Sequence, residues 1–147
     1  MTGLNQDAPE AAYQCGRLFR VLEDIQQNAI PEISTTLADR NRAITRNPAM
    51  LSALVQNSRA HLKRLRRNQK TVAAARALET RLDEVLERIS PFPAQFTITE
   101  QGLFVLGYHH QRAWDRRQRE TASAAKRVRE TGTEPGPEAA PPASPEP

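Results

Sequence analysis

Apolar residues recur along most of the chain at the spacing of an α-helix. The first set has gaps of 4, 3, 4, 3 and 4 positions and comprises Ala11, Cys15, Leu18, Leu22, Ile25 and Ala29. This spacing places all six residues on one helical face. It predicts a helix of about twenty residues that begins with a capping box of Asp7 and Glu10 and ends near Asn28 and Pro31. Because glycine weakens a helix interior, Gly16 is expected to mark a place where another helix comes close.

Three further helices are predicted before residue 91. A short, polar one covers 34–45, with Leu37 and Ile44 as anchors. Asn47 caps the next, whose apolar face comprises Leu51, Leu54, Val55, Ser58, Leu62 and Leu65. After a break at 68–71, another carries Ala75, Leu78, Leu82, Val85, Leu86 and Ile89. Pro91 and Pro93 then prevent continuation of this helix.

A last helix is predicted to begin at a capping box of Thr97 and Glu100. Phe92 and Phe96, just before it, are expected to pin the connection across the bundle. Its residues at helical spacing are Leu103, Phe104, Leu106, Gly107, His110 and Trp114. These residues are apolar on enough sides to predict a helix buried between others, and past Arg116 the apolar set thins, so we expect fraying over 126–130.

The fold class that follows is all-α, a helical bundle of about five helices over residues 1–130. No alternating strand pattern persists, and the short connections favour antiparallel neighbours. Residues 131–147 hold three Glu, no base and six of the eleven prolines, which predicts a disordered Pro/Glu-rich tail. Neither a run of 18 apolar residues nor a secretory signal is present, so we expect a cytoplasmic protein without a membrane segment.

Positive charge is concentrated in the middle of the chain. There are 21 Lys and Arg against 17 Asp and Glu overall, yet residues 40–78 contain ten bases and no acid. Nine of these bases are the candidate nucleic-acid-binding residues: Arg40, Arg42, Arg46, Arg59, Lys63, Arg64, Arg66, Arg67 and Lys70. On a helical wheel Arg59, Lys63, Arg66 and Lys70 form a ridge beside the apolar face. Like charges at this spacing repel, so an anionic group should lie along the ridge.

Two sources of that anion remain open. One is the next helix, which carries Glu79, Asp83, Glu84 and Glu87, although most of these acids have local partners at helical spacing in Arg76, Arg81 and Arg88. The other is the phosphate backbone of a nucleic acid, whose contacts are independent of sequence and weaken with salt.

No catalytic, metal or cofactor site is predicted. Cys15 lies on an apolar face, where packing is its expected role, and a single cysteine makes no structural zinc site. His109 and His110 point about 100° apart on a helix and so cannot share a metal. His61, among bases, is a candidate phosphate contact, and Trp114 fits either the core or a stack on a base. We expect a protein that is not an enzyme.

Three segments of the chain resemble one protein family. They read AAYQCGRLFRVLEDIQ, HLKRL and PAQFTITEQGLFVLGYHHQR. Between about Ala11 and Arg117 the chain is similar to the C-terminal region of the large subunit of Cascade, the type I-C CRISPR surveillance complex. With its start at Met1, it resembles the separate small subunit that this family makes by internal translation initiation.

The resemblance implies a non-catalytic helical bundle. Its implied partners are other Cascade subunits, namely the backbone filament, the large subunit and a second copy of itself, together with the guide RNA and the target DNA. Its implied role is to hold the opened DNA strands of the R-loop while guide pairing reads the sequence. The alternative that remains is a protein-binding scaffold without nucleic-acid contact, because arginine ridges also suit acidic protein surfaces.

Overall fold

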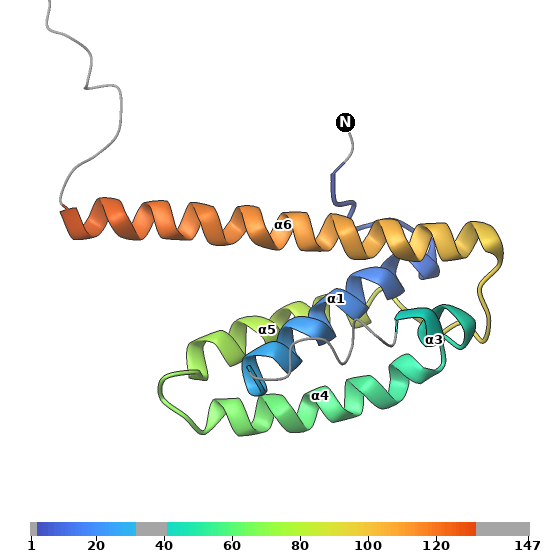
Figure 1. Cartoon of the computed structure of the whole chain (residues 1–147), viewed down its shortest axis with the longest axis horizontal. Coiled ribbons are helices and arrows are strands. Elements are labelled where there is room, and N and C mark those ends of the chain that lie inside the picture. The colour runs from blue at the N-terminus through green and yellow to red at the C-terminus, as the bar shows by residue number, and fades with distance from the viewer. Residues whose placement is uncertain (1–2, 32–40, 132–147) are drawn as a thin grey trace, which may run out of the picture. The chain divides into compact units, whose positions relative to one another are not determined.

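Five helices form the part of the chain that the computed structural model describes, residues 3–31 and 41–131. They are α1 (Ala11–Ala29), α3 (Asn41–Arg46), α4 (Met50–Arg66), α5 (Val72–Leu86) and α6 (Ile98–Thr131) (Figure 1). No strand occurs within these ranges, so the predicted all-α bundle is confirmed. None of the described helices has the length and apolar character that crossing a bilayer requires. The chain divides into two compact units, Met1–Trp114 and Asp115–Pro147.

Helix α1 is the central element of the first unit. It packs against α4 and α5, which also pack against each other. Every residue from Ala12 to Ile25 is buried, including the charged Arg17, Arg20 and Asp24. The apolar stripe predicted a helix with one buried face, whereas α1 is covered on all sides. Its polar residues tolerate burial because they bond to one another and to neighbouring helices, as described below.

The apolar faces predicted for α4 and α5 are the observed core faces. On α4 the buried residues are Leu51, Leu54, Ser58, Leu62 and Leu65. On α5 they are Ala75, Leu78, Leu82 and Val85, and Ile89 is buried just after the helix ends. Phe96 is buried and Phe92 packs against the same core, as predicted. Helical periodicity alone therefore located this part of the core.

The N-terminal capping residues predicted for three helices are observed at one of them. At α6 the capping box is present: the backbone N–H of Thr97 donates to Glu100 Oε1 (2.8 Å), and that of Glu100 donates to Thr97 Oγ1 (3.1 Å). The other two predictions are wrong. At α1 the N-cap is Glu10 without a side-chain bond, and at α4 it is Ala49 rather than Asn47. Asp7 does not cap α1 because its carboxylate instead accepts a hydrogen bond from Arg88 (3.1 Å), which lies far along the sequence.

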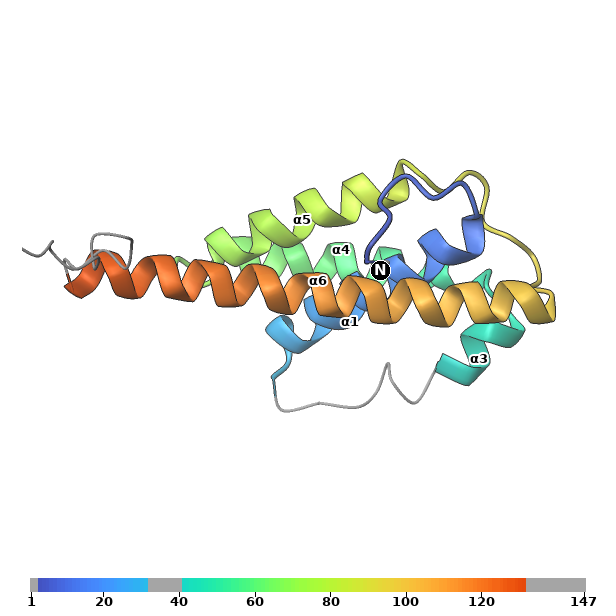
Figure 2. The ribbon, with the colours of Figure 1, turned by 90° about the horizontal axis from the view of Figure 1, so that it is seen from above.

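Two glycines let α1 and the first part of α6 meet backbone to backbone (Figure 2). A Cβ built on Gly16 would lie against the carbonyl oxygen of Phe104 and 2.8 Å from the backbone nitrogen of Tyr108. A Cβ on Gly107 would meet the carbonyl of Tyr13 in the same way. The close helix approach predicted at Gly16 is confirmed, and Gly107 is its counterpart on α6.

Helix α6 differs from its prediction in two respects. Instead of being buried between other helices, it exposes Ile98, Val105 and Leu106, whose relative accessibilities are 87%, 43% and 49%. Instead of fraying from residue 126, it continues to Thr131. The physical reason is local: residues 115–131 contain neither Gly nor Pro and are rich in Arg and Ala, which favour helix without tertiary packing.

Two predictions fall partly outside the described residues. The helix predicted over 34–45 is seen at Asn41–Arg46, where Ile44 is fully buried. Its second anchor, Leu37, lies outside the described residues, as does the predicted tail from residue 132 onwards.

Candidate nucleic-acid interface

The basic ridge of α4 is divided by its neighbour α5. Arg59 forms an ion pair with Asp83 (3.0 Å), and Arg66 forms one with Glu79 (3.1 Å). Both arginines lie on the flank of α4 that faces α5. The interpretation that α5 supplies the counter-charge is therefore correct for these two bases. Each pair is partly exposed, so its contribution to stability is small.

Four other bases remain directed to solvent, and we call them the outer basic face: Lys63, Arg64, Arg67 and Lys70. On the helical wheel Lys63 and Arg67 lie about 140–180° from the core direction, beyond the reach of α5. Among the described residues no carboxylate pairs with any of the four. Lys63 and Arg67 are also four positions apart, so they repel each other. The result is a cluster of exposed positive charge at one end of α4.

The end of α4 shapes an open hollow beside the outer basic face. Arg64 lines it together with Asn28, Asn68 and Thr71. The turn is held by local bonds, since the Asn68 carboxamide oxygen accepts from the backbone N–H of Lys70 (2.8 Å) and Thr71 Oγ1 donates to the carbonyl of Leu65 (2.7 Å). A fixed turn presents Lys70 at a defined place relative to the helix.

His61 is less readily protonated than an ordinary histidine. Its Nδ1 lies 3.4 Å from a guanidinium nitrogen of Arg64. Burial, followed by the positive charge of Arg64, lowers the pKa of the imidazole below its ordinary value. A neutral imidazole can still donate or accept a hydrogen bond, so His61 remains a candidate phosphate contact through hydrogen bonding and not through charge.

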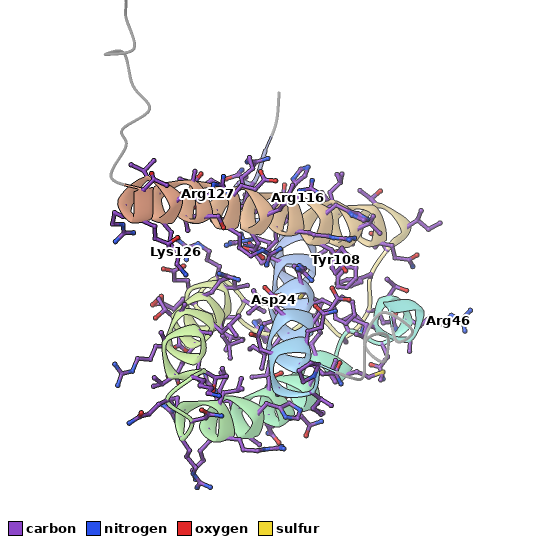
Figure 3. All side chains as sticks on the ribbon, turned by 60° about the vertical axis from the view of Figure 1, so that its left-hand side comes forward. Asp24, Arg46, Tyr108, Arg116, Lys126 and Arg127 are labelled. Atoms are coloured by element: carbon purple, nitrogen blue, oxygen red, sulfur yellow. The ribbon has the colours of Figure 1, made fainter. Side chains whose placement is uncertain are left out.

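The remaining predicted site residues lie elsewhere. Arg46 is exposed in the last turn of α3 and points away from the bundle (Figure 3). It precedes α4, whereas the outer basic face is at the opposite end of that helix, on the order of 25 Å away at 1.5 Å per residue. Arg42 belongs to α3, but its side chain is not described, and Arg40 lies outside the described residues. The structure therefore does not bring these residues together with Lys63.

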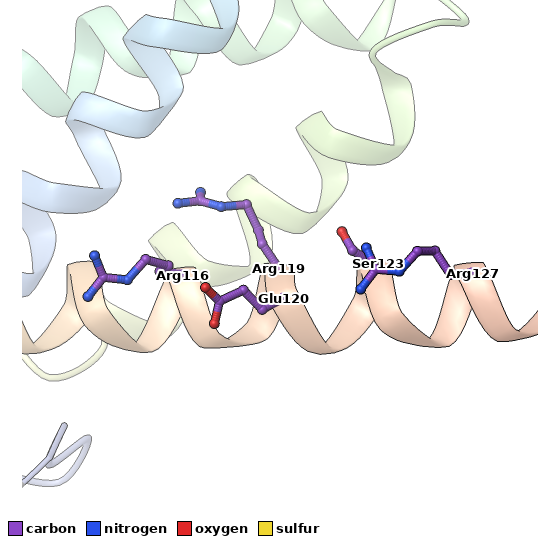
Figure 4. A pocket seen from close by; sticks show the side chains of 5 residues that line it. All are labelled: Arg116, Arg119, Glu120, Ser123 and Arg127. Carbon is purple, nitrogen blue, oxygen red and sulfur yellow. The ribbon is translucent and has the colours of Figure 1, made fainter. Parts of the chain in front are cut away.

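A second basic surface lies on the C-terminal part of α6, in the second unit. Arg116, Arg119 and Arg127 line an open hollow with Glu120 and Ser123 (Figure 4). Sequence reasoning missed it because the apolar set thins past Arg116 and the helix was expected to fray over 126–130. The signal was present, since residues 116, 119, 123 and 127 follow at helical spacing and share a face once the helix is continuous.

Buried polar groups tie α1 to α5 and to the first part of α6. Arg20 pairs with Glu23 (2.7 Å) and Asp24 (3.4 Å) on its own helix. Asp24 also accepts from Arg81 of α5 (3.3 Å), and Tyr108 of α6 donates its hydroxyl to Glu23 Oε1 (2.5 Å); Asp24 and Tyr108 are labelled in Figure 3. These contacts join three helices through one cluster of charges.

This cluster corrects the predicted pairing on α5. The acids of α5 were expected to bind Arg76, Arg81 and Arg88 on the same helix. Instead, Arg81 reaches Asp24, and Arg88 reaches Asp7. Glu79 and Asp83 pair with Arg66 and Arg59 of α4. Contacts between helices, and not only the spacing along α5, thus determine which bases of the ridge are neutralised.

Several side chains with catalytic chemistry have structural partners. Tyr13 Oη and His110 Nδ1 are 2.8 Å apart, and Arg17 Nε donates to Gln111 Oε1 (2.8 Å). Cys15 is fully buried, and burial raises the pKa of its thiol to about 12, so it is a packing residue as predicted. Within residues 3–31 and 41–131 no group of three or more His, Cys, Asp or Glu residues is placed to hold a metal ion.

The Tyr108 hydroxyl predicts a loss of stability in alkali. Burial, with the hydrogen bond to Glu23, raises the pKa of Tyr108 from 10.0 to about 12. Because the folded state holds this proton more tightly than the unfolded chain, the contribution is complete below pH 10 and is lost as the pH rises toward 12. The Tyr108→Phe variant should show a shallower fall in unfolding free energy between pH 10 and 12, measured by urea titration. An unchanged slope would contradict the assignment.

The arrangement so far is typical of a helical binding module: a bundle with bonded polar groups in its interior and an outer basic face that no carboxylate of the described residues neutralises. Comparison with protein families assigns it more closely. A family model described as CRISPR-associated protein (Cas_Csd1) matches residues 1–115, and the chain belongs to that family. The resemblance found in its sequence segments is thereby confirmed. The chain is a type I-C Cascade-related Cas protein that works in a CRISPR complex with other Cas subunits. A comparison with curated proteins finds no match.

Proposed function

We propose that this chain is the non-catalytic small subunit of the type I-C Cascade complex and that its outer basic face holds the opened target DNA. The observation that carries the proposal is the cluster of Lys63, Arg64, Arg67 and Lys70, which is exposed and has no carboxylate partner in the described part of the chain. Exposed Lys and Arg side chains on a rigid helix bind the phosphate backbone of a nucleic acid without recognising its nucleobases. Sequence choice is then left to the guide RNA.

Within the complex, we place the displaced strand of the R-loop on this face. A single strand has accessible phosphates and is flexible enough to follow the end of α4. Arg46, and Arg40 and Arg42 before it, are proposed as additional contacts at the other end of α4. Arg59 and Arg66 take part only where phosphates replace Asp83 and Glu79. The bundle also bridges the backbone filament and the large subunit, in the cytoplasm.

A non-catalytic role is supported by how the reactive side chains are used. The thiol of Cys15 is buried and protonated at neutral pH, and His110 is bonded to Tyr13. Neither group is available as a nucleophile or a general base for a ligand on α4. The chain would therefore hold DNA for a nuclease that is recruited separately.

One observation favours the alternative of a protein-binding scaffold: α6 exposes Ile98, Val105 and Leu106, and exposed apolar side chains that share one face of a helix are typical of protein interfaces. In that alternative, the outer basic face meets acidic surfaces of other subunits. The two functions differ in whether the isolated chain binds nucleic acid.

A titration separates them. Fluorescence anisotropy with a labelled single-stranded oligonucleotide should show binding at about 50 mM salt, with a log–log salt slope near −3, since about four phosphates are neutralised at about 0.7 per contact. A duplex of the same sequence is the comparison. Absence of binding to either DNA at low salt would favour the scaffold and contradict DNA binding by the outer basic face.

A further inference from the structure

The C-terminal part of α6, residues 116–131, is a helix without a core face. Each of its residues is exposed except Val128, which is partly buried. These residues lie beyond 1–115, the range that the family model matches, so membership of the family assigns them no role. A helix that is polar all round is not held by a buried stripe, and its whole surface is available to a partner.

This helix carries a large positive charge in two groups, and we call it the basic segment of α6. Its six bases and two acids give a net charge of +4, which equals the formal net charge of the whole chain. The bases are Arg116, Arg117, Arg119, Lys126, Arg127 and Arg129. Between the two groups, residues 121–125 are Thr, Ala, Ser, Ala and Ala, so five short side chains separate them.

The bases of the segment point to several sides of the helix. At 100° per residue Arg116 and Arg127 are about 20° apart, whereas Arg117 lies about 100° from Arg116 in one direction and Lys126 about 80° in the other. Arg116, Lys126 and Arg127 are labelled in Figure 3. A flat acidic surface would meet only one of these sides. A groove with negative charge on both walls can meet several of them at once, so the distribution favours a grooved polyanion.

The spacing of the two groups fits the major groove of B-form DNA. Their centres are about ten residues apart, which corresponds to about 15 Å along a helix. The major groove is about 12 Å wide and admits an α-helix, so long Lys and Arg side chains reach the phosphates on both of its walls. The short side chains at 121–125 let the middle of the helix approach the base edges. The major groove of A-form RNA is too narrow for the same approach.

From this we propose that the basic segment of α6 lies in the major groove of duplex DNA, with its two groups of bases on the phosphates of opposite strands. Continuous basic helices cross the major groove in this way. The inference goes beyond the proposed function, which concerns an opened strand on the outer basic face of α4. Duplex and single-stranded DNA are then bound by different helices, and either site can fail without the other.

Fluorescence anisotropy of the full chain with a labelled duplex of about 20 base pairs tests the site. Arg117→Glu/Arg129→Glu should weaken duplex binding at least about tenfold and make the log–log salt slope shallower by about 1.8, since two contacts at about 0.9 each are lost. Lys63→Glu/Arg67→Glu makes the same charge change on α4 and should weaken duplex binding severalfold less. With single-stranded DNA the order of the two variants should reverse. Equal losses of duplex binding, or no duplex binding at about 50 mM salt, would overturn the inference.

Modified duplexes test whether the segment lies in the major groove. A bulky substituent at C5 of the pyrimidines faces the major groove and should weaken binding, whereas the same group on guanine N2 faces the minor groove and should not. An RNA duplex of the same sequence should bind at least about tenfold more weakly than the DNA duplex, because its major groove is narrow. Equal affinity for the unmodified and the C5-substituted DNA would contradict binding in the major groove.

Discussion

The Lys63→Glu/Arg67→Glu variant is expected to bind single-stranded DNA at least about tenfold more weakly than the natural chain at about 50 mM salt, with a salt slope shallower by about 1.4. Both side chains point away from the core, and neither has a carboxylate partner in the described residues. Their reversal removes two phosphate contacts and adds repulsion. The helical circular dichroism signal should stay unchanged, because no buried group is altered.

A matched control distinguishes a local site from a general effect of net charge. Arg117→Glu/Arg129→Glu changes the net charge by the same amount on the flank of α6 that lies away from Arg116 and Arg127. Its effect on affinity should be severalfold smaller than that of the α4 variant. Equal losses in the two variants would show that binding follows total charge, and the outer basic face would then have no special role.

The second large effect is expected at the crossing of α1 and α6. Gly16→Ala should destabilise the chain by about 3 kcal/mol or more, because its Cβ would meet the backbone of Phe104 and Tyr108, which cannot move without shifting the helix. Thermal and urea unfolding followed by circular dichroism measure this loss. Gly107→Ala should behave in the same way from the other side of the contact.

Gly102→Ala is the control for this prediction. The added methyl group meets nothing within 4 Å, so the substitution should stabilise the chain by about 0.5–1 kcal/mol through helix propensity alone. The effects of Gly102→Ala and Gly16→Ala on the unfolding free energy should therefore have opposite signs. A loss at Gly102 as large as that at Gly16 would mean that any alanine in place of glycine disturbs this fold.

Sequence periodicity predicted the elements whose environment is simple. Helices α4 and α5 each have one buried face, so the apolar spacing from Leu51 to Leu65 identified their core residues directly. The capping box of Thr97 and Glu100 was predictable because both partners lie within four residues. The close approach at Gly16 was predictable because glycine weakens a helix interior, and that cost is offset where a neighbouring backbone needs the space.

The parts that depend on distant partners were not predictable. The periodicity of α1 gave no sign that Arg17, Arg20 and Asp24 are buried, since their partners come from helices later in the chain. For the same reason, the sequence did not indicate which basic residues of the ridge are neutralised, since their acidic partners lie on another helix. Arg59 and Arg66 differ from Lys63 only in the side of α4 that α5 covers, and a wheel drawn for α4 alone cannot include that neighbour.

The charge cluster of Arg20, Glu23, Asp24, Arg81 and Tyr108 limits which substitutions the chain can accept during evolution. Loss of Tyr108 or Arg81 alone removes a cross-helix partner of Glu23 or Asp24 in a water-poor interior, which is costly, while replacing both members of a pair by apolar residues of similar size is not. Across related proteins, the residues at 23 and 108 should therefore covary, as should those at 24 and 81. Mutational routes between such sequences pass through destabilised single mutants, and this keeps the registry of α1 fixed over evolution.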